Sequence, residues 1–253
     1  MTTPTLAGFD ATFAEDLARA AGKIQRLYFR PDGIEREINA LTIARIRERF
    51  GDRVSIQGEE GGHLVEGTKW KVVFDPLDGT FPYGHGIPVS TFALALLHEG
   101  APVLAVIFDP FGDQLAIAER GKGALLNGRP MHVGRFETID RRASIGLVWW
   151  KGSRHQVGQL AALLPERGAT VLNLCSISYM GLKVASGELA GTVFPGESAH
   201  DSAAIQLVVE EAGGKVTSIT GAPQSYDGKV DGHIASNPTL HGQLLELVRE
   251  VDR

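Results

Sequence analysis

Two aspartates share the six-residue stretch Asp75-Pro76-Leu77-Asp78-Gly79-Thr80 with a glycine and a threonine. Their carboxylates are hard oxygen ligands of the kind that Mg²⁺ prefers. Gly79 lets a backbone N–H approach an anion closely, and Thr80 adds a hydroxyl beside it. These residue types on one short stretch predict a hydrated divalent cation that holds a phosphate group.

The apolar run Trp70–Phe74, immediately before this stretch, indicates a strand. Pro76 cannot donate to a sheet ladder, and the pair Asp78-Gly79 favours a tight turn. We therefore expect the strand to end at Phe74 and the chain to fold back where it carries the two carboxylates.

The stretch also has a purely structural interpretation, because Asp-Pro and Asp-Gly are among the commonest turn-forming pairs. A second copy of the pattern, from Asp109 to Asp113, also ends an apolar run. Another apolar segment, 114–118, follows it at once, so we interpret the second copy as a hairpin loop.

A covalent phosphatase mechanism is the chemical alternative. Phosphatases that phosphorylate their own aspartate carry Asp-x-Asp-Gly-Thr after a strand, and Asp78 begins the matching second half here. The position of the attacking carboxylate is Pro76, and Asp75 lies one residue too far back. In a regular strand Asp75 and Asp78 would also face different sides. The covalent mechanism therefore fails.

The composition is that of an ordinary globular protein. The 253 residues, 43% apolar and 22% charged, can bury a large core. A net charge of -5 gives no basic footprint for nucleic acid or for an anionic membrane, and neither partner is expected. The single cysteine, Cys175, excludes an internal disulfide, and we expect it to be a buried small hydrophobe. No signal peptide or membrane span is visible, so we expect a cytoplasmic protein.

Hydrophobic periodicity predicts an opening helix over roughly the first thirty residues and a second helix from Ile34 to Phe50. The segment from Val89 to Ala118 is typical of an antiparallel meander. Further strands are expected at 54–56, 144–149, 171–174, 191–194, 215–218 and 233–235, and helices at 154–164, 179–186, 201–212 and 239–251.

The composition shifts near residue 140, which suggests two halves. We expect residues 1–140 to form an N-terminal α+β half with the metal-binding motifs. Residues 141–253 would form a C-terminal α/β half that contributes Asp201 and the substrate pocket. Helices, then mixed strands, then alternating helices and strands predict a layered α+β fold.

Three further carboxylates are candidates for the same site as Asp75 and Asp78. Glu59 and Glu60 follow the strand at 54–56, so two neighbouring strands would bring four carboxylates to one rim. That many unpaired charges destabilise a fold unless cations bind there. Asp201 opens a late helix, where free N–H groups favour a carboxylate, and helix capping alone would explain it equally well.

Taken together, these motifs resemble those of the inositol monophosphatase family. That family carries Gly-Glu-Glu, then Asp-Pro-Ile/Leu-Asp-Gly-Thr, then Trp-Asp-x-Ala-Ala-Gly leading to Glu-Ala-Gly-Gly. The corresponding stretches are Gly58-Glu59-Glu60, Asp75 to Thr80, His200 to Ile205, and Glu211 to Gly214. The resemblance covers nearly the whole chain. It implies a layered αβαβα sandwich and Mg²⁺-dependent hydrolysis of a phosphate monoester.

The resemblance also implies the metal ligands. By the family pattern, Glu59, Asp75 and the carbonyl of Leu77 would hold a first Mg²⁺. Asp75, Asp78 and Asp201 would hold a second. The family's Thr-x-x-Asp segment between its first two helices is missing here, so a third, weakly bound Mg²⁺ is left open.

The phosphate and the attacking water would be placed by the same stretch. By the family pattern, the N–H groups of Gly79 and Thr80 would bind phosphate oxygens at a helix start, with Pro82 in its first turn. Thr80, together with Glu59 or Glu60, would orient a metal-activated water for attack.

Departures from the family pattern concern the substrate pocket. Phe81-Pro82 stands where the family has an Asn two residues after the Thr, His200 replaces a Trp, and Ile205 replaces a Gly. Members that act on inositol phosphates carry a Glu where this chain has Phe194, with Glu197 three residues on. Glu197 and His200 are therefore candidate substrate ligands, although His200 also fits as a filler for the missing Trp.

The resemblance implies a phosphatase for a small polyol or sugar monophosphate, similar to inositol 1-phosphate. Fructose 1,6-bisphosphate, histidinol phosphate and a nucleotide 3′-phosphate are alternative substrates. A non-catalytic homologue that binds metal or phosphate is the alternative from another functional class. The family pattern further implies inhibition by lithium and a homodimer.

Overall fold

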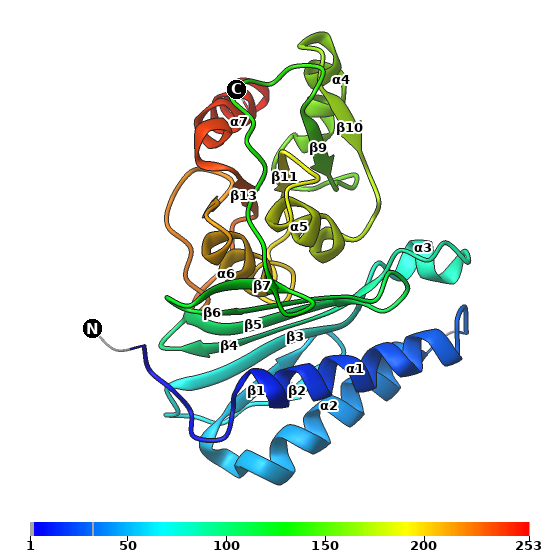
Figure 1. Cartoon of the computed structure of the whole chain (residues 1–253), viewed down its shortest axis with the longest axis vertical. Helices are drawn as coiled ribbons and strands as arrows, with labels where there is room; N and C mark the ends of the chain where they lie inside the picture. Colours follow the sequence, from blue (N-terminus) through cyan, green and yellow to red (C-terminus); the bar gives the residue numbers. More distant parts are fainter. Residues whose placement is uncertain (1–2, 32, 253) are drawn as a thin grey trace.

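The computed structural model describes residues 3–31 and 33–252, and helices and sheets alternate in layers within it. Figure 1 shows the order from bottom to top: α1 (Ala11–Leu27) and α2 (Ile34–Phe50), a large sheet, α5 (Ile177–Ala185) and α6 (Ala203–Glu211), a smaller sheet, and α4 (Val157–Glu166) with α7 (Pro238–Val251). This arrangement confirms the layered αβαβα sandwich.

The larger sheet has eight strands in the order β2-β1-β3-β4-β5-β6-β7-β8. They are β1 (Ser55–Gly58), β2 (Gly61–His63), β3 (Trp70–Asp78), β4 (Thr91–His98), β5 (Ala101–Asp109), β6 (Gln114–Glu119), β7 (Gly123–Leu126) and β8 (Arg129–Pro130). β1 and β3 are parallel, whereas the other neighbours are antiparallel. β3, β4 and β5 are almost entirely buried because helices cover both faces of the sheet. The expected meander is confirmed.

The smaller sheet has five strands in the order β10-β9-β11-β13-β12. They are β9 (Ser144–Leu147), β10 (Thr170–Leu172), β11 (Gly191–Phe194), β12 (Lys215–Thr217) and β13 (His233–Ser236). β9 is parallel to both β10 and β11, and β13 is antiparallel to β11 and β12. Two short helices, η1 (Gly51–Arg53) and α3 (Thr80–Gly84), complete the elements of the described residues.

Buried apolar side chains form three clusters, one between the outer helices and each sheet and one that fills the space between the two sheets around α5 and α6. The cluster below the large sheet joins α1 and α2 to β3, β4 and β5. The cluster between the sheets joins α5 and α6 to both of them. Within residues 3–31 and 33–252, no helix is both long and apolar enough to cross a bilayer.

β3 continues through the predicted metal-binding stretch, so the expected strand end at Phe74 is wrong. It pairs with β4 as far as Asp78, and the register shifts between Asp75 and Asp78. Pro76 falls within this irregularity, where a residue without an N–H is tolerated. The shift also breaks the regular alternation of side chains, and both aspartates are buried. The turn comes later, at Gly79.

Two acidic residues of the sequence motifs are structural. Asp109 Oδ1 accepts hydrogen bonds from the N–H groups of Phe111 (2.9 Å) and Gly112 (3.0 Å), in agreement with the hairpin-loop interpretation. The carboxylate of Glu211 accepts from the N–H groups of Gly121 (2.9 Å) and Gly123 (2.8 Å). Glu211 therefore fixes the turn between β6 and β7 from the end of α6.

Candidate active site

Four carboxylates from distant parts of the chain act on one another. Glu59 follows β1, Asp75 and Asp78 belong to β3, and Asp201 lies in the turn before α6. The charges of Asp78, Glu59 and Asp201 all act on Asp75, and those of Asp78 and Glu59 act on Asp201. The structure thus brings together the four carboxylates that the sequence predicts as metal ligands.

The parallel pairing of β1 with β3 places Glu59 beside Asp75. Gly58 lies opposite Phe74, and the N–H of Glu59 donates to the Phe74 carbonyl at 3.2 Å. Because parallel strands end at the same edge of a sheet, the residues that follow β1 reach the irregular end of β3.

A buried glutamine on α1 holds the irregular part of β3. Gln25 Nε2 donates to the Pro76 carbonyl at 2.9 Å, and Gln25 Oε1 accepts from Ser90 Oγ at 3.0 Å. Asp75 Oδ1 accepts from the N–H of Leu77 at 2.9 Å. Sequence reasoning missed Gln25, although an amide on the otherwise apolar face of α1 is a signal that could have found it.

Asp78 lies at the amino terminus of α5. Its Oδ2 accepts from Ser176 Oγ at 2.7 Å and from the Ser178 N–H at 2.6 Å, and its Oδ1 accepts from the Ile177 N–H at 3.2 Å. Free N–H groups and the helix dipole favour a negative charge at this position. α5 begins at Ile177, earlier than the expected residue 179, and the serines that bind Asp78 were missed. A serine directly before an apolar helical pattern is the signal that could have identified them.

Each of these carboxyl groups has a raised pKa. The pKa of Asp75 is raised well above its usual range by burial and by the charges of Asp78 and Glu59. Burial likewise raises the pKa of Asp201 well above its usual range. It raises the pKa of Asp78, although hydrogen bonds from the start of α5 oppose it. Glu59 is exposed, but the partial loss of water around its carboxyl group, together with nearby charges such as that of Asp78, raises its pKa against a lowering hydrogen bond with Asp75. The four groups therefore favour either protonation or a bound cation.

The donor set fits Mg²⁺, because all four side chains offer hard oxygen ligands. Among the described residues, neither a lysine nor an arginine forms an ion pair with any of them, and the nearest basic group is His200 Nε2, 3.8 Å from Asp201 Oδ2. In the described part of the chain, no group of three His, Cys, Asp or Glu side chains is arranged so that it could hold one metal ion. The carboxylates are thus neighbouring donors whose missing counter-charge a divalent cation would supply.

Gly79 and Thr80 lie where β3 turns into α3. Gly79 precedes the helix with a φ of 96°, and a Cβ on it would lie 2.7 Å from the Val89 carbonyl oxygen and 2.9 Å from Ser176 Cβ. Only glycine fits such a position without strain. Thr80 is exposed, and its Oγ1 donates to the Leu77 carbonyl at 3.4 Å. The predicted helix start with Pro82 in its first turn is confirmed.

The structure also decides two further points, the surroundings of Glu60 and the capping alternative for Asp201. Glu60 is exposed, and its Oε2 lies 3.6 Å from Arg36 Nε, although its charge still acts on Glu59. Asp201 is not a helix cap, because Ser202 occupies the N-cap position of α6. The capping alternative for Asp201 is therefore wrong.

Glu197 and His200 lie shortly before Asp201 in the chain. Glu197 and Asp201 line one cavity of about 400 Å³, and Glu197 Oε1 lies 2.9 Å from Lys229 Nζ. His200 is half-buried, its Nδ1 has no hydrogen-bond partner within the described residues, and burial lowers the pKa of its ring. A half-buried neutral imidazole in this place agrees with the filler interpretation.

Cys175 is half-buried, so the expectation of a fully buried small hydrophobe is wrong. It lies two residues before the start of α5 with a φ of 52°, a backbone conformation that residues with side chains rarely adopt. Asn173 Oδ1 accepts from its N–H at 3.1 Å.

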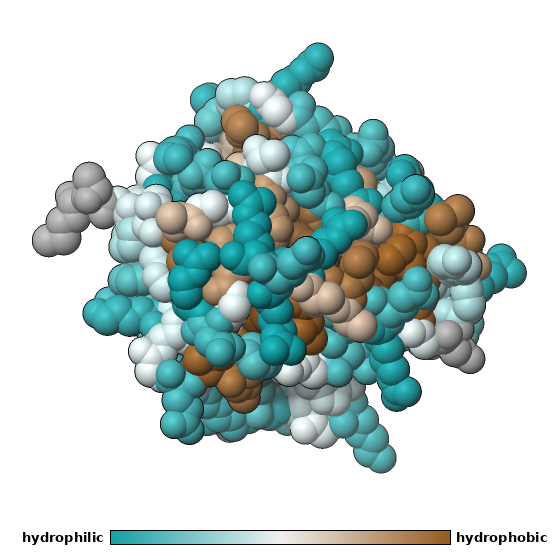
Figure 2. All heavy atoms as spheres, turned by 90° about the horizontal axis from the view of Figure 1, so that it is seen from below, coloured by the Kyte–Doolittle hydropathy of each residue, from teal (hydrophilic) through white to brown (hydrophobic). Residues whose placement is uncertain are grey.

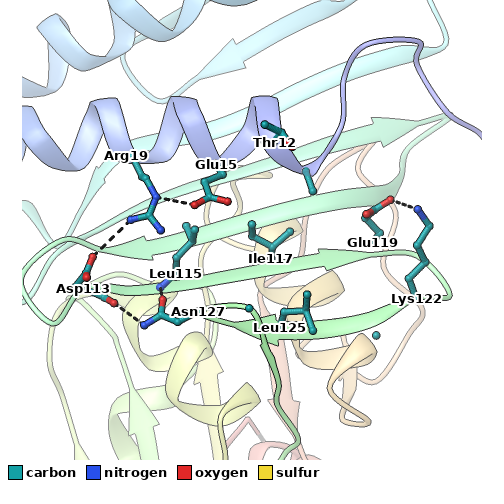
Figure 3. A pocket seen from close by; sticks show the side chains of 13 residues that line it. Thr12, Glu15, Arg19, Asp113, Leu115, Ile117, Glu119, Lys122, Leu125 and Asn127 are labelled. Atoms are coloured by element: carbon teal, nitrogen blue, oxygen red, sulfur yellow. Dashed lines mark hydrogen bonds and ion pairs between the residues drawn. The ribbon is translucent and has the colours of Figure 1, made fainter.

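A larger groove, of about 710 Å³, lies between α1 and the strands β6 and β7, and none of the predicted site residues lines it. Figure 3 shows that its charged side chains pair with one another. Arg19 contacts Glu15 at 2.7 Å and Asp113 at 3.7 Å, and Lys122 contacts Glu119 at 2.5 Å. With its charges already compensated, this groove lacks the chemistry that the carboxylate site offers.

Comparison with known proteins places these observations in a family. The family model described as the inositol monophosphatase family matches residues 32–253. An inositol-1-monophosphatase of Mesorhizobium japonicum is 32% identical over 217 residues, which cover 82% of this chain and 77% of the relative. A histidinol-phosphatase of Chlorobaculum parvum is 30% identical over 264 residues, covering 96% of this chain and 98% of the relative. The solved structure of a Thermotoga maritima IMPase matches with a TM-score of 0.85 at 25% identity and covers 95% of this chain and 96% of its own.

Proposed function

The chain belongs to the inositol monophosphatase family of phosphatases, which hydrolyse phosphate monoesters, and we propose that it acts with Mg²⁺ on a small polyol or sugar monophosphate such as inositol 1-phosphate. The observation that carries the proposal is the group formed by Glu59, Asp75, Asp78 and Asp201, which share a site without a compensating lysine or arginine in the described chain. Packing demands no such group, whereas a bound cation explains it.

Histidinol phosphate is the second candidate substrate. The match to the histidinol-phosphatase of Chlorobaculum parvum extends over 96% of this chain, compared with 82% for the inositol-1-monophosphatase of Mesorhizobium japonicum. Phe194, which stands where inositol-phosphate members carry a Glu, also supports a less polar alcohol.

The proposed ligands follow the family pattern. Glu59, Asp75 and the carbonyl of Leu77 would hold one Mg²⁺, and Asp75, Asp78 and Asp201 would hold the second. When bound, Mg²⁺ polarises the phosphoryl group and activates a water for attack. A third, weakly bound Mg²⁺ would lack the family's Thr-x-x-Asp segment, and Glu35, in the first turn of α2, is the nearest carboxylate there.

Thr80 and Glu59 would orient the attacking water. Thr80 Oγ1 is exposed beside the Leu77 carbonyl, and Glu59 would stand at the metal position that this carbonyl shares. Glu60 is the weaker candidate because Arg36 already compensates it. The N–H groups of Gly79 and Thr80 would bind phosphate oxygens, and Glu197 or His200 would contact the alcohol.

A homodimer and a cytoplasmic location are further parts of the proposal. Figure 2 shows a strip of apolar side chains on the face that α1 and α2 form. Leu27 and Tyr28, at the end of α1, are 65% and 50% exposed, and Tyr28 contacts α3 through its carbonyl and Tyr83 Oη. An exposed apolar area of this kind favours contact with a second copy. Light scattering would test it, with Leu27→Glu expected to favour the monomer.

The test of the activity is phosphate release from inositol 1-phosphate, histidinol phosphate, glycerol 2-phosphate, fructose 1,6-bisphosphate and adenosine 3′,5′-bisphosphate. Each compound is assayed with Mg²⁺ and with a chelator. Metal-dependent turnover of one ester well above the others supports the proposal and identifies its substrate. Mg²⁺ binding by calorimetry without turnover of any ester would favour the non-catalytic alternative.

A matched pair of variants separates the site from the fold. Asp75→Asn should abolish turnover, whereas Asp109→Asn, at the structural copy of the Asp-Pro pair, should keep it. Lithium should inhibit by occupying the second metal position, so full activity in tens of millimolar Li⁺ would contradict the assignment.

A further inference from the structure

The cavity beside Asp201 has two walls, and one of them is the segment between β9 and α4. The cavity, of about 400 Å³, is lined by Trp150 and Arg154 on that side and by Pro195 and Glu197 on the other. Since Asp201 belongs to the same lining, a molecule in the cavity lies next to the carboxylate group. We call this space the Trp150 cavity.

Trp150 presents its indole to the cavity because its neighbour is anchored. Trp149 packs into the cluster above the smaller sheet, and its ring occupies the space over Gly158, where a Cβ would approach it to 2.9 Å. Trp150 is therefore directed away from that cluster and is 47% exposed. Its ring contacts the Phe194 ring edge-to-face, with centroids 6.0 Å apart. Phe194 in turn lies 5.5 Å from the His233 ring, so the indole rests on a buried aromatic stack.

The segment that carries Trp150 is held in place at its far end. His155 is buried, and its Nδ1 and Nε2 lie 2.6 Å from Asp252 and 3.1 Å from Asp231. Arg154 Nη1 donates to Asp231 at 3.1 Å, so Asp231 holds both residues. Asp231 and Asp252 thus fix one end of the wall before any ligand enters, which lowers the entropic cost of ordering that end on binding.

Five polar side chains line the Trp150 cavity: Ser153, Arg154 and Glu197 have partners within the protein, and Ser198 and Asp201 complete the polar lining. Glu197 is paired with Lys229, and Arg154 is paired with Asp231. Phe194 brings no polar atom to the stack. A polyhydroxylated ring needs several free donors and acceptors, whereas a flat heteroaromatic ring needs an aromatic surface and one or two polar contacts at its edge.

We propose that the Trp150 cavity binds the alcohol part of the substrate and selects an alcohol that carries a heteroaromatic ring, which lies against the Trp150 indole with Glu197 or Arg154 at its edge. This inference rests on the proposed phosphatase activity and favours the second candidate substrate, histidinol phosphate, over a polyol monophosphate. Stacking on an aromatic side chain changes affinity by about tenfold to a hundredfold when the side chain is truncated to alanine.

The test compares two esters in three variants. Trp150→Ala should lower kcat/KM for histidinol phosphate by about tenfold to a hundredfold, mainly through KM, and leave inositol 1-phosphate unchanged. Trp150→Phe should restore most of the loss because it keeps a flat ring. Leu125→Ala, an exposed apolar side chain of β7, is the matched control and should affect neither ester.

Three results would overturn the inference while the phosphatase proposal stands: an equal loss for both esters in Trp150→Ala, no loss for either, or a wild-type preference for inositol 1-phosphate. If no ester is hydrolysed, the phosphatase proposal fails, and the inference is tested instead by whether the Trp150 cavity binds free histidinol. Saturation-transfer NMR with free histidinol should then show ring contacts in the wild type that Trp150→Ala loses, and their absence would overturn it.

Discussion

Asp78 accepts a hydrogen bond of 2.6 Å from the backbone N–H of Ser178, a residue 100 positions later in the chain. The contact joins the irregular end of β3 to the first turn of α5. One carboxylate of the proposed metal site therefore also ties the large sheet to the helical layer above it. Changes at this site should affect stability as well as chemistry, and the two effects can be separated.

Replacing Asp201 by Asn should stabilise the metal-free protein. Burial and the charges of Asp78 and Glu59 raise the pKa of Asp201 well above its usual range, so its ionised form destabilises the fold at neutral pH. Among the described residues its carboxylate accepts no hydrogen bond that the amide would lose. We expect a higher melting temperature than the wild type in chelator, measured by calorimetry.

The same variant should lose the stabilisation that Mg²⁺ gives the wild type, because ligand binding to the folded state raises its stability. A raised carboxyl pKa also means that metal-free wild type gains stability as pH falls from the folded pKa toward the ordinary value of about 4, since the folded state then takes up more protons. Asp201→Asn should flatten that dependence, and a lower melting temperature than the wild type in chelator would contradict the argument.

Replacing Gln25 by Met should destabilise the protein although the volume hardly changes. The Pro76 carbonyl and the Ser90 hydroxyl would each lose a buried partner, at a cost of roughly 1–3 kcal/mol in the free energy of unfolding. Denaturant unfolding measures the loss. Gln206→Met is the matched control, because Gln206 is also buried but makes one side-chain bond instead of two: its Nε2 donates to Glu210 at 3.0 Å, and its Oε1 has no partner in the described chain. Similar losses in both variants would show that Gln25 has no special role.

Gly79→Ala should damage both the fold and the turnover. The new Cβ would lie 2.7 Å from the Val89 carbonyl oxygen and 2.9 Å from Ser176 Cβ at a φ of 96°, so the turn between β3 and α3 must move away from these two residues. Gly67→Ala isolates the backbone contribution, since Gly67 has a φ of 75° but open space around it. We expect a loss of about 1 kcal/mol for Gly67→Ala and a clearly larger one for Gly79→Ala, with loss of phosphate release only in the latter. Equal losses would mean that the close approach at Gly79 is unimportant.

His155 should make stability decrease as pH rises. Burial opposes the charge of its ring, but the hydrogen bonds to Asp231 and Asp252 outweigh burial and raise its pKa above 6.5. The stabilisation is therefore complete below pH 6.5, the unfolded value, and is lost as pH rises through the folded pKa. Melting temperatures across that range should fall in the wild type. In His155→Gln, which cannot titrate, this part of the decrease should disappear, and an unchanged profile would refute the ion-pair interpretation.

The local part of the site could be predicted from the sequence, because the Asp-Pro-Leu-Asp-Gly-Thr residues lie on one continuous stretch. The turn at Gly79 follows from residue preferences, and the helix start at Thr80, with Pro82 in its first turn, follows from the family pattern. The end of β3 at Asp78 could not be predicted from the sequence. The strand continues past Pro76 because this residue falls in an irregular part of the pairing with β4. Local preference favoured a turn, and tertiary pairing overrode it.

The supporting residues were missed for a related reason. Gln25 and Ser178 reach β3 from positions 51 residues before Pro76 and 100 residues after Asp78. No spacing rule connects such positions, since their contact depends on how the layers stack. Trp150 was missed because its exposure depends on its neighbour Trp149 packing into the core instead. Sequence reasoning thus found the charged groups and not the groups that orient them.

The bonds between Asp78 and the start of α5 have a consequence for the order of folding. They close a loop of about 100 residues, and such long closures raise contact order and slow folding. During synthesis, β3 leaves the ribosome long before α5 and Asp201. Asp75 and Asp78 therefore lack these partners until the later residues have been made. Catalytic competence should therefore arise late in folding, after most of the large sheet has formed, and refolding followed by phosphate release should lag behind refolding followed by circular dichroism.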